Sequence, residues 1–333
     1  MNILYVPDCY SQQRQHEKPA DVYPVRMAME ATYDRNNGHN VTWWAKNIEY
    51  KPSENVTCLY DQTVTEPRYD NFTELPTPDR LFTDAFNKQY QKYGNYKHNP
   101  ATHMQVADGC WYGKCTFCVE NGRGWQVRQV DDVIEEIRSC YRMGFKEIFD
   151  DSGTFPDGLW MKSFCEKKLI SGLFGMKIGC NMRIGASVDF KLMKQAGFRM
   201  VLFGVESANQ STLDKIGKGT NAKDIIPTIK RASEAGLSPH IATMHGFPWE
   251  SDEEELKTIK MVHYLLRKGY AKTAQASTFS NPGTRPDVVH PNVNNIYNVA
   301  YTPEFWINKI KDIKEWSDFT YLLKGIRKGI IHD

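Results

Sequence analysis

The chain has 333 residues, and its 42 Lys and Arg residues nearly balance 40 Asp and Glu residues, which leaves a formal net charge of +2. Apolar residues make up 41% and charged residues 25%, a globular composition that excludes a wholly disordered, collagen-like or coiled-coil chain. So small a charge gives no reason to expect a broad nucleic-acid-binding surface. No apolar run approaches the roughly 20 residues that span a bilayer, and the first residues lack the features of a signal peptide. We therefore expect a protein of the reducing cytoplasm, with no membrane contact.

Residues 1–100 predict a small α/β unit followed by an irregular connector. Asn2–Val6 and Val41–Ala45 are predicted as strands, and Tyr23–Tyr33 is predicted as a helix between them. Residues 46–95 are rich in Asn, Thr, Pro and Tyr, which is typical of loops.

From about residue 104 onward, strands and helices alternate at regular spacing. The predicted strands are Met104–Ala107, Lys146–Asp151, Lys177–Ile184, Arg199–Glu206, Pro239–Gly246 and Thr273–Phe279. The predicted helices are Val130–Met143, Leu159–Leu169, Phe190–Ala196, Ala222–Ala235 and Glu253–Lys268. This alternation indicates an α/β fold with a parallel sheet, curled by right-handed crossovers into an open or closed barrel. The tail, Pro303–Ile330, predicts one or two amphipathic helices that cap the barrel.

In such barrels the chemistry lies at the carboxyl ends of the strands. The polar residues found at the predicted strand ends are the cysteine-rich loop after the first strand, Asp150 and Asp151, Arg183, Glu206 and His245. Because all of these residues lie at the same end of the predicted sheet, they predict a single site there.

The three cysteines of that loop, Cys110, Cys115 and Cys118, fall within nine residues. A close group of thiols in a reducing compartment is typical of a metal site. Structural zinc normally takes four protein ligands, so a zinc site would need His103 or a distant cysteine as well. Three thiolates alone suit a [4Fe–4S] cluster with one iron left open, and incidental core cysteines are the remaining alternative. Three other cysteines are predicted to be packing residues: Cys140, Cys165 and Cys180.

Several motifs in order resemble those of the radical S-adenosylmethionine (radical SAM) enzymes, in the branch of the cobalamin-type enzymes, methylthiotransferases and Elongator catalytic subunit. The resemblance covers roughly residues 75–330. It rests on the segments Leu75–Arg80, Asp108–Cys118, Phe149–Phe155, Asn181–Arg183, Phe203–Ser207, Lys215–Gly219, Gly246–Glu250 and Asn281–Thr284. It implies a partial (β/α)6 TIM-like barrel with a small N-terminal α/β region and C-terminal helices. The implied organisation is a reduced Rossmann-like region at 1–74, a core barrel with its lead-in at 75–285 and a helical extension at 286–333.

The resemblance also implies the cofactors and the chemistry. Cys110, Cys115 and Cys118 would ligate a [4Fe–4S] cluster, and S-adenosylmethionine would chelate the fourth iron. Reductive cleavage would then yield a 5′-deoxyadenosyl radical that abstracts hydrogen from the substrate. An electron donor of the flavodoxin or ferredoxin type is implied as partner.

The resemblance further implies roles for individual residues, each with a simpler alternative. Phe117 would lie beside the adenine, or be an ordinary loop aromatic. Asp150 or Asp151 would accept from the ammonium group, or cap the next helix.

Arg183 would pair with a substrate or methionyl carboxylate, or with Glu206 on the next strand. Glu206 would bind ribose hydroxyls, and Lys218 would meet the methionyl carboxylate or be a solvated turn residue. His245 would contact substrate or transfer a proton, or be a core histidine.

Two departures from the family pattern bear on function. Four residues separate the first two cysteines, where the commonest spacing has three; three thiolates can still share one cluster. The Asp-x-His-x-x-Gly loop of many cobalamin-binding relatives is missing, so cobalamin is disfavoured as a further cofactor. A cobalamin-dependent methyltransferase and a non-catalytic protein stabilised by iron–sulfur or zinc remain the alternatives. Peptide, nucleobase and small metabolite are all open as substrates.

Overall fold

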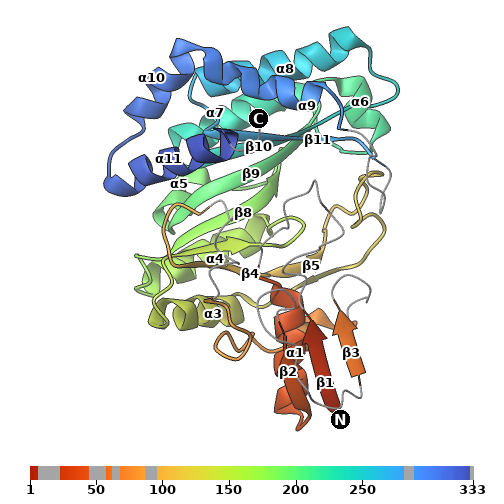
Figure 1. Cartoon of the computed structure of the whole chain (residues 1–333), viewed down its shortest axis with the longest axis vertical. Helices are drawn as coiled ribbons and strands as arrows, with labels where there is room; N and C mark the ends of the chain where they lie inside the picture. The colour runs from red at the N-terminus through yellow and green to blue at the C-terminus, as the bar shows by residue number, and fades with distance from the viewer. Residues whose placement is uncertain (7–22, 45–57, 62–67, 87–95, 281–288, 331–333) are drawn as a thin grey trace.

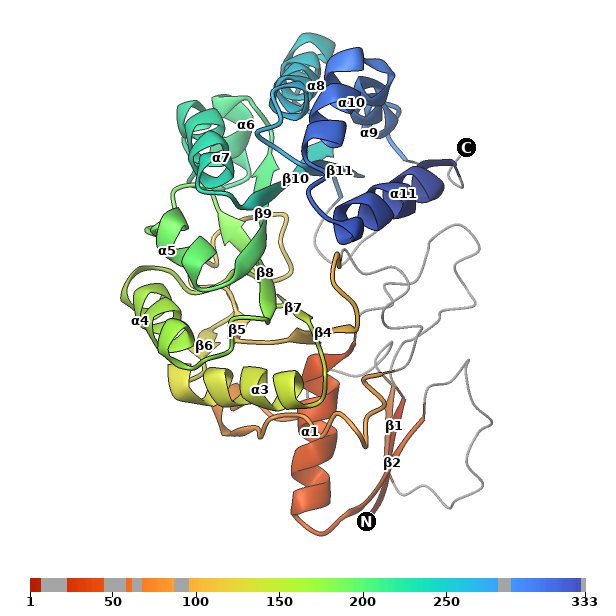
Figure 2. The same ribbon diagram turned by 90° about the vertical axis from the view of Figure 1, so that its left-hand side faces the viewer.

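The computed structural model describes residues 1–6, 23–44, 58–61, 68–86, 96–280 and 289–330. Its centre is a six-stranded parallel sheet in the order β11-β10-β9-β8-β7-β4. The sheet curls into a half-barrel with helices along its outer side (Figures 1 and 2). This is a partial TIM-like barrel, so the predicted fold class is confirmed. The strands are β4 (Ala101–Met104), β7 (Glu147–Asp150), β8 (Lys177–Arg183), β9 (Phe198–Glu206), β10 (Ser238–His245) and β11 (Thr273–Thr278).

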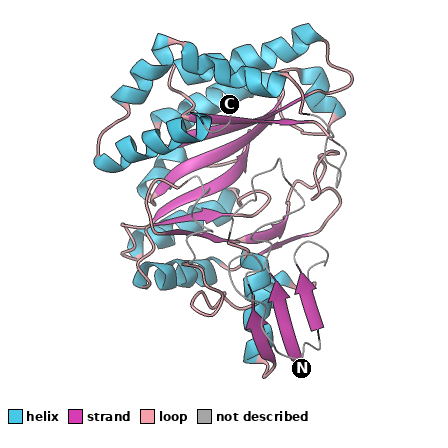
Figure 3. Cartoon of the chain, viewed as in Figure 1, coloured by secondary structure: helices cyan, strands magenta, loops and turns pink. Residues whose placement is uncertain are grey.

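The outer helices follow the strands along the chain (Figure 3). They are α3 (Val130–Arg142), α4 (Gly158–Ile170), α5 (Phe190–Gln195), α6 (Gln210–Lys215), α7 (Ile225–Glu234) and α8 (Asp252–Arg267). Local sequence determines where several of them begin. The Asp189 side chain accepts from the first amides of α5, and Ser251 with Glu254 forms a capping box at the start of α8, which satisfies amide groups that lack a helical partner.

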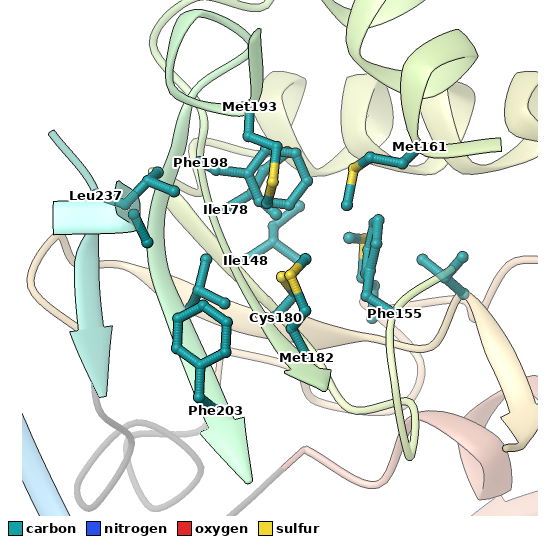
Figure 4. Packing of buried hydrophobic residues seen from close by; sticks show 14 of the residues in the cluster. Ile148, Phe155, Met161, Ile178, Cys180, Met182, Met193, Phe198, Phe203 and Leu237 are labelled. Carbon is teal, nitrogen blue, oxygen red and sulfur yellow. The ribbon is translucent and has the colours of Figure 1, made fainter. Parts of the chain in front are cut away.

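The core lies between the sheet and these helices. Alternate residues of the strands point outward, as Ile148, Ile178 and Phe203 do, and meet Phe155 of the loop before α4 and Met161 and Met193 of the outer helices (Figure 4). Burying each such side chain contributes about 1.5–3 kcal/mol. Cys140, Cys165 and Cys180 are fully buried in the same layer, which confirms that they are packing residues.

The N-terminal region forms a second, smaller sheet in the order β2-β1-β3, all parallel. Its elements are β1 (Asn2–Val6), α1 (Val25–Asn36), β2 (Asn40–Trp43) and β3 (Cys58–Asp61). The strand at Asn2–Val6 is confirmed, whereas β3 lies in a stretch predicted as loop. Tyr23, Met29 and Phe72 of this region belong to the same apolar core as the barrel. The domain boundaries at 74 and 285 stay predictions.

The C-terminal segment adds α9 (Asn292–Asn295), a 3-10 helix (Ile296–Tyr301), α10 (Pro303–Lys311) and α11 (Trp316–Ile330). One or two helices were predicted over Pro303–Ile330, and two, α10 and α11, are present. The amino group of Lys97, just before β4, lies 2.9 Å from Glu315 and 2.5 Å from Asp318. The Tyr321 ring lies 5.7 Å from the Arg199 guanidinium at the start of β9. The α11 segment therefore covers the amino end of the strands, opposite the predicted site. In the described ranges no helix is long and apolar enough to cross a membrane.

The first barrel strand was predicted too late in the chain. It ends at Met104, and Ala107–Gly109 belongs to a separate strand, β5, which pairs antiparallel with β6 (Trp125–Val127). The chain turns between β4 and β5 because the Val106 amide donates to Asp150 and to Ser152 instead of continuing the sheet. The helix predicted over Ala222–Ala235 begins with a 3-10 turn, Ala222–Asp224.

A buried ionic network joins the connector before β4 to α3. The Glu136 carboxylate has no exposed surface and pairs with the guanidinium groups of Arg80 and Arg128. Burial alone would raise the pKa of Glu136, but Arg128 and Arg80 lower it below its ordinary value. The contribution of this network to stability is therefore present above the ordinary carboxyl pKa and is lost as the pH falls through the lowered pKa.

Replacing Glu136 by Gln should destabilise the protein by about 3–5 kcal/mol, because two buried guanidinium groups lose their shared counter-charge. The matched control is Glu135→Gln on the same helix, where an exposed carboxylate pairs with Arg138; its effect should stay below about 1 kcal/mol. Denaturant unfolding at neutral pH measures both. Equally small losses of unfolding free energy in the two variants would show that the network does not stabilise the fold.

Candidate active site

The three clustered cysteines lie on a loop closed by the β5–β6 hairpin. Gly109 and Trp125 are paired at the neck of this hairpin, and residues 110–124 run between them. Cys115 is buried, and Cys110 and Cys118 are partly exposed. Inside the loop, the Cys118 amide donates to the Cys115 carbonyl at 3.1 Å, and the Glu120 amide lies 3.4 Å from the Cys118 sulfur.

Gly109 allows the two strands to meet at the neck of the loop. It has a φ of +78°, and a Cβ atom there would lie 1.9 Å from the Gly124 carbonyl oxygen. No side chain fits at that distance, and the positive φ is itself unfavourable for other residues. The hairpin that holds the cysteines therefore requires glycine at this position.

The cysteine loop packs against the turn after α6. The Thr116 amide donates to the Ile216 carbonyl at 2.9 Å, and the Tyr112 hydroxyl donates to the Gly217 carbonyl at 2.9 Å. A Cβ atom on Gly219 would lie 2.0 Å from the Tyr112 hydroxyl oxygen. The cysteine loop therefore approaches this turn so closely that the glycines of the Lys215–Gly219 motif leave no room for side chains.

Arg183 joins the end of β8 to the cysteine loop. Its guanidinium carbon lies 3.5 Å from the centre of the Tyr112 ring, a cation–π contact. One of its nitrogens is 3.7 Å from the Cys115 sulfur, and another donates to the Lys218 carbonyl. The alternative in which Arg183 pairs with Glu206 is wrong, because its guanidinium is used in these three contacts.

Glu206 pairs instead with Lys218, at 2.7 Å between the carboxylate oxygen and the amino group. Both side chains are about nine-tenths buried, so the alternative of a solvated turn lysine is also wrong. The Lys218 amino group lies 5.7 Å from the centre of the Phe117 ring. Four of the predicted cofactor-binding residues are therefore brought together beside Cys115.

The two aspartates at the end of β7 occupy different environments. Asp150 is fully buried and accepts from the Val106 amide at 2.8 Å and from the Ser152 hydroxyl at 2.9 Å. Burial raises the pKa of Asp150 to about 7. Asp151 is exposed. Neither caps the next helix, since the residue before α4 is Asp157.

Neither predicted histidine joins this group in the part of the chain that the structure describes. His245 is fully buried, its Nε2 lies 3.4 Å from the Thr243 hydroxyl, and burial lowers its pKa. His103, the candidate fourth zinc ligand, is buried in β4 and hydrogen-bonded to the Tyr96 hydroxyl. Burial lowers the pKa of His103 to about 3.

The donor set of the loop fits an iron–sulfur cluster. Burial raises the pKa of the Cys118 thiol, and the neighbouring Cys115, Glu120 and Cys110 side chains raise it further. Among the described side chains, no group of three or more His, Cys, Asp or Glu residues is already drawn together as a metal site. By their chemistry, the three thiols of the loop suit a [4Fe–4S] cluster better than structural zinc, which normally takes four protein ligands.

Comparison with known proteins agrees with this arrangement. Residues 104–262 match the family model described as the radical SAM superfamily. The chain belongs to the radical SAM superfamily. Membership in this superfamily makes it an enzyme, and the family implies a [4Fe–4S] cluster and S-adenosylmethionine as cofactors.

Two curated relatives show how far the similarity extends. An uncharacterized methyltransferase of Pyrococcus horikoshii is 31% identical over 229 residues, which cover 66% of this chain and 47% of the relative. A putative methylthiotransferase of Methanocaldococcus jannaschii is 29% identical over 170 residues, covering 47% of this chain and 37% of the relative. The chain thus spans less than half the length of these relatives.

Two solved structures are similar to part of this chain. The cobalamin-dependent S-adenosylmethionine radical enzyme OxsB is 17% identical with a TM-score of 0.48, covering 71% of this chain and 34% of that one. The radical S-adenosylmethionine methyltransferase TsrM of Kitasatospora setae is 17% identical with a TM-score of 0.49, covering 61% of this chain and 38% of that one.

Substituting Ala for Gly109 should prevent this radical SAM protein from retaining iron, because the new Cβ would force the neck of the cysteine loop apart. Gly122→Ala is the matched control, since Gly122 has a φ of +72° and open space around it. Both variants bear the backbone cost of about 1–2 kcal/mol, and only the first adds the steric clash. Iron per chain after anaerobic reconstitution should fall at least fivefold for Gly109→Ala alone. Equal retention in both variants would contradict this account.

Proposed function

We propose that this radical SAM enzyme holds a [4Fe–4S] cluster on Cys110, Cys115 and Cys118 and cleaves S-adenosylmethionine reductively, so that hydrogen is abstracted from a substrate. The observation that carries the proposal is the assembly of Arg183, Lys218, Glu206 and Phe117 beside Cys115. When bound, the cluster would supply one electron to S-adenosylmethionine and so generate a 5′-deoxyadenosyl radical.

The first role of the surrounding residues is electrostatic. Arg183 brings a buried positive charge to 3.7 Å from the Cys115 sulfur. At that position its charge offsets part of the negative charge that three thiolate ligands would introduce.

Their second role is to bind the methionyl and adenosyl parts of S-adenosylmethionine. Lys218 offers an ammonium group to the methionyl carboxylate, with Glu206 holding it in place at 2.7 Å. The remaining Glu206 oxygen is a charged acceptor for ribose hydroxyls, and the Phe117 ring offers an apolar face to the adenine. At the end of β7, Asp151 is the better acceptor for the ammonium group, because both Asp150 oxygens already accept hydrogen bonds: Oδ1 from the Val106 amide and the Ser152 hydroxyl, and Oδ2 from the Ser152 amide.

The reaction class and the electron donor belong to the same proposal. The names of the two relatives favour transfer of a methyl or methylthio group as the outcome on the substrate. A small one-electron donor protein of the flavodoxin or ferredoxin type would reduce the cluster. A cluster that forms without cleavage of S-adenosylmethionine would instead favour the non-catalytic alternative considered from sequence.

The test is formation of 5′-deoxyadenosine. After anaerobic reconstitution with iron and sulfide, the protein given dithionite and S-adenosylmethionine should release this product, measured by liquid chromatography and mass spectrometry. Cys118→Ala should reduce the rate by at least about 100-fold, because one ligand of the cluster is lost.

The matched control is Cys165→Ala, which removes a fully buried thiol in α4. It should keep its iron and its product formation. Uptake of zinc in place of iron by the unmodified protein, or unchanged product formation by Cys118→Ala, would refute the proposal. Visible absorption of bound cobalamin in the purified protein would instead favour the cobalamin-dependent methyltransferase.

A further inference from the structure

The hairpin that carries the cysteines contacts the N-terminal region through one pair of facing side chains. Asp108 of β5 and Gln126 of β6 are directly opposite each other in the antiparallel register. Side chains of such a pair lie on the same face of the two strands. Asp108 is also two residues before Cys110, so any movement of this pair moves the start of the cysteine loop.

Asp108 is bound by α1 of the N-terminal region. A terminal nitrogen of Arg26 lies 3.0 Å from the Asp108 carboxylate, and the two side chains are only 15% and 24% exposed. The other groups of Arg26 have partners too. Its Nε donates to Glu30 at 3.1 Å, its second terminal nitrogen donates to the Tyr69 carbonyl, and its guanidinium lies 5.1 Å from the centre of the Phe72 ring.

Gln126 is bound by the segment that follows the small sheet. Its side-chain oxygen accepts from the Phe72 amide at 2.7 Å, and its side-chain nitrogen donates to the Asp70 carbonyl at 2.8 Å. The side-chain amide of Gln126 therefore pairs with the backbone of residues 70–72 as a neighbouring strand would.

These contacts close a ring. Arg26 binds Asp108, Asp108 faces Gln126 across the hairpin, Gln126 binds residues 70–72, and Arg26 returns to the Tyr69 carbonyl. Both strands of the hairpin are thus held by residues that precede the barrel in the chain. Figure 1 shows α1 and the small sheet below the barrel, with α1 beneath β4.

We propose that Arg26 is a positioning residue for the cysteine loop, and that the N-terminal region keeps the β5–β6 hairpin closed so that the loop presents its thiols together. This proposal rests on the proposed function, because it assigns the loop to cluster binding. It also gives the N-terminal region a task that requires no ligand of its own.

The first experiment needs no cluster. Hydrogen–deuterium exchange of the metal-free full chain, read by mass spectrometry, should show peptides spanning 107–127 exchanging on the order of tenfold faster in Arg26→Gln. Asp108→Asn should have the same effect while it leaves the other Arg26 contacts in place. Peptides from α8 should be unchanged, and Arg26→Lys should restore most of the protection.

The matched control is Arg35→Gln on the same helix, where an ion pair with Asp79 is exposed on both sides. It should leave the hairpin peptides unchanged. Unaltered exchange of the hairpin in both Arg26→Gln and Asp108→Asn would overturn the proposal. Faster exchange throughout the barrel, α8 included, would also overturn it, since Arg26 would then act on the whole fold.

A second readout separates this proposal from the proposed function. After reconstitution, Arg26→Gln should retain less than about half the iron of the unmodified protein, and Arg26→Lys should recover it. If the unmodified protein binds no iron, the proposed function fails; faster exchange of the hairpin would still support its attachment to the N-terminal region.

Discussion

The site depends on the position of the Arg183 guanidinium. This group lies over the Tyr112 ring and contacts the Cys115 sulfur and the Lys218 carbonyl. Arg183 ends a central barrel strand, Tyr112 and Cys115 belong to the cysteine loop, and Lys218 belongs to the turn after α6. A single buried cation thus fixes three separate segments relative to one another. The charge itself is tolerated there because an aromatic face, a thiol and a carbonyl replace the lost water.

The rest of the molecule keeps this arrangement in place. The outer helices bury the apolar face of the sheet, so that alternate residues on the opposite face are left free for the site. Separate buried ion pairs hold the supporting parts: Arg80 and Arg128 with Glu136 behind the loop, and Arg199 with Glu147 at the amino end of the strands. The N-terminal region adds its contacts to the hairpin from below. These ion pairs and packed elements hold the cysteine loop in place, although the loop has little regular structure of its own.

Much of this arrangement could be predicted from sequence, for identifiable reasons. Apart from α6, which was not predicted, the barrel strands and helices follow from apolar periodicity and from glycines that end helices, and their bounds lie within three residues of the prediction. The positions of Arg183 and Glu206 follow because parallel strands bring their carboxyl ends to one edge. The β5–β6 hairpin was missed because its short strands lack an apolar pattern. Tyr112 was missed because its partner, Gly217, lies 105 residues later in the chain, and only the structure brings them together. The use of Asp150 within the β4–β5 turn was missed for the same reason.

The central claim is that the loop holds a cluster with one iron left for S-adenosylmethionine. Electron paramagnetic resonance of the reconstituted, dithionite-reduced protein tests this most directly. We expect the signal of a single reduced [4Fe–4S] cluster whose g values shift when S-adenosylmethionine is added, because the ligand reaches the open iron. A cluster signal that stays unchanged at saturating S-adenosylmethionine would show that all four irons are already ligated, and would contradict the account.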